Sequence, residues 1–259
     1  MIVNHTMRAL KSDGFTLVEL AVVVAVIALM LGSLLVPLTS QVEQRNVSQT
    51  ERTLDLAREA LLGYALINGR LPCPDTNDDG LENAAPIGDP ESCAGGQYAG
   101  NLPWATLGVS QADGWGDRLK YRVTKEFARA TSGPAPTALA LTSTGDLTVV
   151  SRNPQTKVEV PLANAVPAVI ISFGKNRSGA TTENGSIIAP PPSSRADENA
   201  NATATTTKFF FRGPSPPTGS ATCNDSAGPT VSFCEFDDQV TWISTNILLN
   251  RLVAAGKLP

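Results

Sequence analysis

Histidine is almost absent from this chain of 259 residues, and the single copy, His5, lies close to the N-terminus. The rest of the chain therefore lacks the commonest general base and the commonest ligand of transition metals. It also contains no Gly-Lys-Ser/Thr phosphate-binding loop and no Gly-x-Ser-x-Gly nucleophile elbow. These absences argue against an enzyme, so we expect a structural or binding protein that requires no cofactor.

Aromatic residues and clustered positive charge are also scarce. Aromatics make up 5% of the chain, and the formal net charge is -4. Lys and Arg form no patch or run, so the basic footprint of a nucleic-acid-binding protein is missing. Small and polar residues are abundant in the second half, which is typical of an exported, β-rich domain with long loops. We expect no nucleic-acid partner.

A long apolar run begins at Phe15, directly after a short basic segment that ends in Gly14. The run continues to Leu38, and about 20 apolar residues are enough to span a bilayer. Glu19 lies inside it, although a charged side chain in hydrocarbon costs about 2.5–3.5 kcal/mol. An ordinary secretory signal peptide or a plain membrane anchor would explain the apolar run. Neither explains Glu19 together with the Gly14–Phe15 junction.

The segment Gly14-Phe-Thr-Leu-Val-Glu19 resembles the N-terminal signature of type IV pilins and of type II secretion pseudopilins. The resemblance implies that prepilin peptidase cuts between Gly14 and Phe15 and that Phe15 is then N-methylated. Glu19 would meet the N-terminal amine of a neighbouring subunit during assembly. A carboxylate in an apolar setting is tolerated when a cation pairs with it there.

The fold implied is α+β and pilin-like: a long N-terminal helix, transmembrane in one half and amphipathic in the other, packed on an antiparallel β-sheet domain with long loops. Arg8 and Lys11 precede the apolar run, so the leader should stay on the cytoplasmic side of the bacterial inner membrane. The expected parts are a leader (1–14), a transmembrane helix half (15–38), an amphipathic helix half (39–69) and a periplasmic or extracellular β-rich domain (70–259).

Helical spacing of Leu54, Ala57 and Leu61 marks the apolar stripe of the amphipathic half, and Asn68-Gly69 is a helix stop signal. Beyond it, alternating and β-branched runs predict strands. Two stretches rich in Ser, Thr, Pro, Asn and Gly, 175–207 and 213–228, are predicted to be mobile loops, either insertions without function or a binding face. The expected strands are 119–123, 138–141, 147–150, 158–160, 168–173, 208–211 and 236–243.

The resulting hypothesis is a pilin-like subunit of a type IV pilus or secretion pseudopilus, located in the inner membrane before assembly. The chain is longer than a typical major pseudopilin, which favours a minor subunit. Its expected partners are prepilin peptidase, other pilin or pseudopilin subunits, an inner-membrane assembly platform and membrane lipid. The alternative hypothesis is a monomeric, membrane-anchored periplasmic ligand-binding domain.

Four cysteines in an exported chain indicate disulfides. Three connectivities are open, and sequence proximity favours Cys73–Cys93 and Cys223–Cys234. A zinc site is disfavoured because the chain has no Cys-x-x-Cys pair and no histidine beyond His5.

Asp75, Asn77 and Asp79 alternate before Gly80, as in the first half of an EF-hand calcium loop. The closing glutamate of such a loop is missing, because its twelfth position is Pro86. We therefore predict either a calcium site or an acidic, solvated loop beneath the Cys73–Cys93 bridge.

Two acids near the C-terminus, Asp237 and Asp238, can also supply oxygen ligands. Pseudopilins have a calcium site near an Asp-x-x-x-Trp segment, and Asp238 and Trp242 share that spacing. The resemblance thus implies a second candidate ion site, although Lys175 and Arg177 stand where acids would help. Ser244 is expected to cap a short C-terminal helix.

Overall fold

The computed structural model describes residues 16–86, 92–129, 139–216, 223–228 and 230–258. The side chains of 31–38 lie outside this description. The chain divides into two compact units, Met1–Gln44 and Arg45–Pro259. Helix α1 (Leu17–Asn68) begins in the first unit and ends in the second.

The described side chains of α1 in the first unit are exposed, including the apolar Leu17, Val18 and Leu29. Among the described residues, no helix has a stretch both long and apolar enough to span a membrane. The transmembrane half predicted for 15–38 is therefore not confirmed.

In the second unit, α1 buries one stripe of its surface. Leu54, Ala57 and Leu61 face the core, with exposed fractions of 5%, 0% and 0%. The helix ends at Asn68 because Gly69 adopts a positive φ of 70°, and its amide donates to the carbonyl of Ala65 at 2.8 Å. This is the amphipathic pattern and the stop signal that the sequence predicts.

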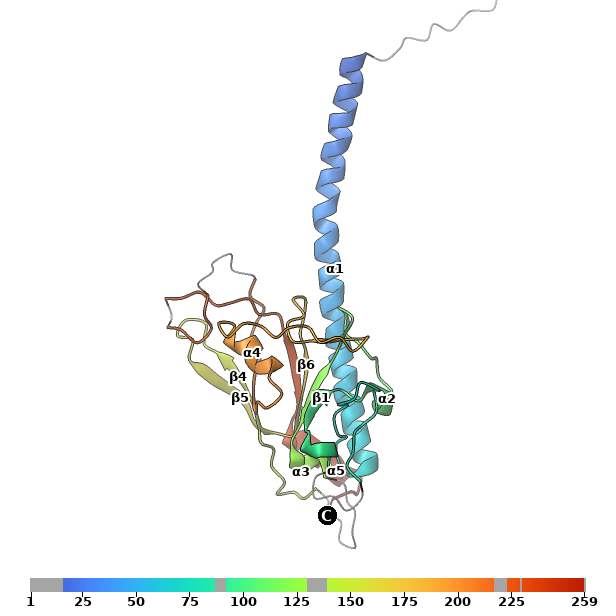
Figure 1. Ribbon diagram of the computed structural model, residues 1–259, viewed down its shortest axis with the longest axis vertical. Helices are drawn as coiled ribbons and strands as arrows, with labels where there is room; N and C mark the ends of the chain where they lie inside the picture. Colours follow the sequence, from blue (N-terminus) through green and yellow to red (C-terminus); the bar gives the residue numbers. More distant parts are fainter. Residues whose placement is uncertain (1–15, 87–91, 130–138, 217–222, 229, 259) are drawn as a thin grey trace, which may run out of the picture. The chain divides into compact units, whose positions relative to one another are not determined.

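The core sheet has four antiparallel strands in the order β1-β3-β6-β9, and β1 and β6 are labelled in Figure 1. All five residues of β6 are buried because both faces of this strand are covered. Ile170 packs with the apolar stripe of α1, whereas Val169 and Ile171 pack with a second sheet. The strands are β1 (Ala99–Asn101), β3 (Lys120–Val123), β6 (Ala168–Ser172) and β9 (Gln239–Ile243).

The core sheet is antiparallel as predicted, whereas a second sheet contains one parallel pair. Its order is β5-β4-β8, and β4 (Leu147–Arg152) pairs parallel with β8 (Lys208–Phe210). A parallel pair needs a long crossover connection. Strands β5 (Glu159–Val166) and β6 and helix α4 (Ala196–Ala202) lie between the two in the chain.

Short elements complete the second unit. Helix α5 (Thr245–Ala254) packs Leu248 and Leu252 into the same core as α1. The region 138–141, predicted as a strand, contains no strand in its described residues, 139–141. The remaining elements are η1 (Ala94–Gly96), α2 (Trp104–Leu107), β2 (Asp117–Arg118), α3 (Lys125–Ala128) and β7 (Thr181–Thr182).

The stretch 175–207 is not the simple loop that its composition suggests, because it contains β7 and α4. Helix α4 is tied down by Asp197, which is fully buried and accepts from Arg152 at 2.7 Å and from Arg212 at 3.0 Å. Arg212 also contacts the buried Asp225 at 3.0 Å. The amino-acid composition of the stretch could not predict this ion-pair network, because the paired residues are far apart in the sequence.

Candidate functional site

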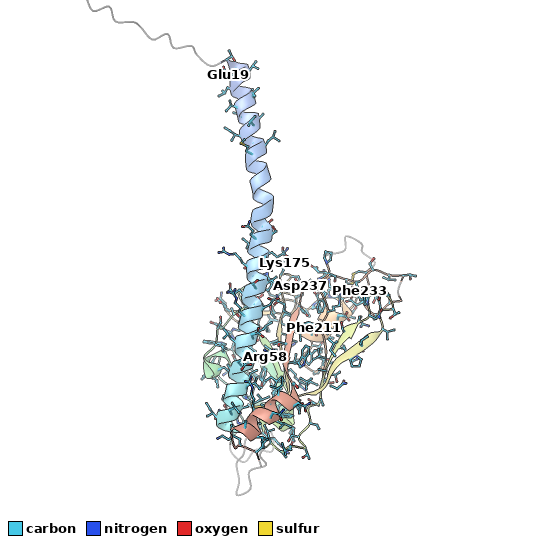
Figure 2. The ribbon with its side chains drawn as sticks, turned by 180° about the vertical axis from the view of Figure 1, so that it is seen from behind. Glu19, Arg58, Lys175, Phe211, Phe233 and Asp237 are labelled. Carbon is cyan, nitrogen blue, oxygen red and sulfur yellow. A yellow bond between two sulfur atoms is a disulfide. The ribbon has the colours of Figure 1, made fainter. Side chains whose placement is uncertain are left out.

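The start of helix α1 carries the predicted assembly residue. Gly14 and Phe15 lie outside the described residues. Thr16 caps the helix, because its hydroxyl accepts a hydrogen bond from the amide of Glu19 at 3.2 Å. Glu19 is thus the third residue of the first turn, the acid position of a capping box. Its side chain is exposed, and within the described residues its carboxylate has no hydrogen bond or ion pair (Figure 2).

A second candidate site is an acidic cluster of Glu198, Asp237 and Asp238 in the second unit. One carboxylate oxygen from each lies within 4.8 Å of the other two, so they are close enough to share a metal ion. Glu198 comes from α4, and both aspartates precede β9. The position of Asp237 is marked in Figure 2. Of these residues, the sequence pointed to the two aspartates and missed Glu198.

Hydrogen bonds hold one oxygen of each acid in the cluster. The amide of Asn176 donates to Asp237 at 2.7 Å, and the Asn176 side chain donates to Glu198 Oε1 at 2.9 Å. Asn201 donates to Asp238 Oδ2 at 2.8 Å. The other oxygens, Glu198 Oε2, Asp237 Oδ1 and Asp238 Oδ1, are buried and accept no hydrogen bond in the described chain.

Among the charges that act on the cluster are two positive side chains. Arg195 lies 3.6 Å from Glu198 Oε2, and Lys120 acts on Asp238 as a favourable charge. Burial nevertheless raises the pKa of Glu198 to about 7 and that of Asp238 well above its usual value. It also raises the pKa of Asp237. Buried, incompletely compensated carboxylates of this kind fit a hard divalent cation, which binds oxygen ligands.

Hydrogen bonds within the Asp75–Asp79 loop occupy several of its side-chain oxygens. The fully buried Asp75 accepts hydrogen bonds from the amides of Asn77, Asp78 and Gly80, at 3.1, 2.8 and 2.8 Å. Asp79 accepts from the Asn77 side chain at 2.9 Å. These oxygens therefore already fasten the loop from within. Calcium binding by Asp75, Asn77 and Asp79 stays a prediction.

Both disulfides favoured by sequence proximity are present in the structure. Cys73 is bonded to Cys93, and both are fully buried in the core that includes α1. Cys223 is bonded to Cys234, which is fully buried, whereas Cys223 is partly exposed. The second bridge lies directly before the acids that precede β9.

Comparison with known proteins identifies the N-terminal segment. Residues 10–35 match the prokaryotic N-terminal methylation motif, the signature of type IV pilins and pseudopilins. No curated protein and no solved structure matches the chain. The chain thus carries the mark of a pilin-like structural subunit, a class processed by prepilin peptidase and assembled with other pilin subunits.

Proposed function

We propose that this protein is a minor pilin-like subunit that assembles into a type IV pilus or secretion pseudopilus. Prepilin peptidase removes residues 1–14, Phe15 is N-methylated, and the subunit waits in the inner membrane with its C-terminal domain in the periplasm. The observation that carries the proposal is the methylation motif over 10–35. An inner-membrane platform and neighbouring subunits are its partners.

The position of Glu19 supports assembly through its side chain. The Thr16 cap uses the amide of Glu19, so the carboxylate is left available for a neighbour. Cleavage would create a free amine at Phe15, which can pair with the carboxylate of the next subunit. Each charge is costly in an apolar setting unless it is paired, so this contact would fix the stagger between subunits. Repetition of one head-to-tail contact that does not close produces a filament.

The minor-subunit assignment draws support from the second unit. A three-stranded sheet and the ion-pair network around Asp197 add to the helix-and-sheet core that the resemblance implies. Such additions favour a specialised position over the repeating shaft.

The test is incorporation of Glu19→Ala into filaments. We expect loss of the variant from the sheared filament fraction, with an unchanged amount of the protein in membranes. Glu51→Ala is the matched control, because Glu51 is another exposed acid on α1, within the second unit. Normal incorporation of Glu19→Ala would contradict the proposed contact and favour the monomeric anchored domain.

We also propose that Glu198, Asp237 and Asp238 hold a divalent cation, with calcium as the best candidate. Their carboxylates are hard oxygen ligands, and calcium takes six to eight such ligands, completed by backbone oxygens and water. Asp238 is 6% exposed and keeps one oxygen without a hydrogen-bond partner in the described chain. A cation would compensate that buried charge and fasten α4 to the segment before β9.

A further inference from the structure

Two neighbouring hollows share Trp242 as part of their walls. One, of about 350 Å³, lies between α1 and the end of β9 and is lined by Leu62, Trp242 and Ile247 among others. The other, of about 460 Å³, lies beside the start of α5 and is lined by Asn164, Trp242 and Asn246 among others. Both belong to the second unit. Ser244 also lines both, so Trp242 and Ser244 stand where the hollows meet.

The side chain of Trp242 is fixed by its neighbours but remains partly exposed. Its ring is partly buried and packs on the edge of the core between the two sheets. Phe211 meets it edge-on, with ring centroids 5.8 Å apart and planes at 78°. Phe211, which is labelled in Figure 2, is itself 41% exposed. A fixed, accessible indole is a platform on which a flat apolar surface of a ligand can stack.

Three neutral polar side chains lie around Trp242, in the walls of the two hollows. In the part of the chain that the structure describes, the side chains of Asn164, Ser244 and Asn246 make no hydrogen bond, and Ser244 does not cap α5 with its hydroxyl. Asn164 and Asn246 are exposed. Amides and hydroxyls both donate and accept, so they match ligands that carry many hydroxyl groups.

The charged side chains at the hollow next to α1 meet opposite charges. Arg251 pairs with Glu59 at 2.7 Å, and Arg58 pairs with Asp55 at 3.3 Å. This wall therefore presents little uncompensated charge to a ligand, which favours an uncharged occupant.

We propose that the double hollow around Trp242 binds a neutral oligosaccharide. A pyranose ring has one face of C–H groups, which stacks on the indole, and an equatorial fringe of hydroxyls, which Asn164, Ser244 and Asn246 bind. The two hollows that share Trp242 give room for further sugar units next to the stacked ring. An apolar helix or peptide would instead require a row of apolar anchor pockets. Here half of the residues that line the hollow beside α5 carry a hydroxyl or amide side chain: Ser143, Thr144, Asn164, Ser244, Thr245 and Asn246.

The test is calorimetric titration of the full-length protein, kept in a detergent without a sugar headgroup. The probes are chitohexaose, cellohexaose and maltohexaose, each offered separately. We expect at least one to bind, and Trp242→Ala to weaken it by about tenfold or more, since an aromatic stacking contact is lost. Trp242→Phe should retain part of the affinity. Trp115→Phe is the matched control and should bind as the parent does.

A stability measurement and a second variant separate loss of binding from loss of folding. Because Trp242→Ala removes core contacts, its thermal unfolding is measured in parallel, and the exposed pair Asn164→Ala/Asn246→Ala provides a second variant. This double variant should fold as the parent does and bind more weakly. Binding of none of the three sugars, or binding unaffected by both variants, would overturn the proposal. A synthetic peptide of residues 17–30 is titrated in the same way. Binding of this peptide and of none of the sugars would also overturn the proposal, because the hollow would then be a contact between copies of this chain.

Discussion

The hydroxyl of Thr16 accepts the amide hydrogen of Glu19 at 3.2 Å, so the first turn of α1 is capped by a residue of the methylation motif itself. The cap involves the backbone of Glu19, whereas the proposed assembly contact involves its carboxylate. Two functions of one short motif are therefore separable by mutation.

Thr16→Val should fray the start of α1 while leaving the carboxylate of Glu19 in place. Loss of an N-cap side chain costs about 1 kcal/mol. Glu19→Ala retains the cap and loses only the smaller interaction of an acid with the helix dipole, about 0.5 kcal/mol. Amide hydrogen exchange over residues 17–20 should accelerate clearly in Thr16→Val and little in Glu19→Ala. Equal acceleration in both variants would mean that the carboxylate is part of the cap.

Removal of the two disulfides should have unequal effects. The Cys73→Ser/Cys93→Ser pair opens a bridge that is fully buried in the core with α1, and should cost about 3 kcal/mol or more of stability. The Cys223→Ser/Cys234→Ser pair opens a shorter loop with one partly exposed cysteine, so its cost should be lower, about 2 kcal/mol. Urea unfolding of both variants under oxidising conditions measures the difference. The reverse order would contradict this ranking.

Calcium should raise the melting temperature of the protein, because the ion binds only the folded state. Asp238→Asn should abolish the shift and raise the melting temperature without calcium, since a poorly compensated buried charge is removed. Asp79→Ala should retain the shift if the ion binds the acidic cluster. Loss of the shift in Asp79→Ala alone would place calcium in the Asp75–Asp79 loop instead. If calcium does not raise the melting temperature of the parent protein, neither site binds calcium.

Acid should weaken the contact between Arg70 and Glu82. Burial raises the pKa of Glu82, but hydrogen bonds from Arg70 at 2.8 and 2.9 Å and from Tyr64 outweigh it, and the net pKa is lowered. A lowered carboxylate pKa contributes stability above the unfolded value, near 4.5, which is lost as the pH falls through the folded value. Glu82→Gln should flatten the stability profile in this acid range and cost about 2 kcal/mol at neutral pH. An unchanged acid slope would contradict this assignment.

Short sequence patterns predicted the helix end and the strands that depend on neighbouring residues. The stop of α1 at Asn68 follows from Gly69, and the strands β4 and β6 follow from β-branched runs near 147–150 and 168–173. The parallel pairing of β4 with β8 has no local signal, because it depends on where the chain returns after α4.

The candidate ion sites also depend on contacts between distant segments, which the local sequence does not reveal. Alternating acids at Asp75 and Asp79 fit a calcium loop, but the same residue types also form hydrogen-bonded turns, which is how Asp75 is used here. Glu198 lies in a stretch whose composition suggests a loop, and only the fold brings it to Asp237. A set of ligands that comes from two distant segments could not be predicted from the sequence of either segment alone.

The most direct test of the central claim is the mass of the N-terminal peptide of protein purified from cells that contain prepilin peptidase. The account predicts a chain that begins at Phe15 and carries one added methyl group. Gly14→Leu should retain the intact leader, because the peptidase must accept the residue before the cut. An N-terminus still at Met1 in the parent, or a cut at any other bond, would contradict the assignment of this chain as a pilin-like subunit.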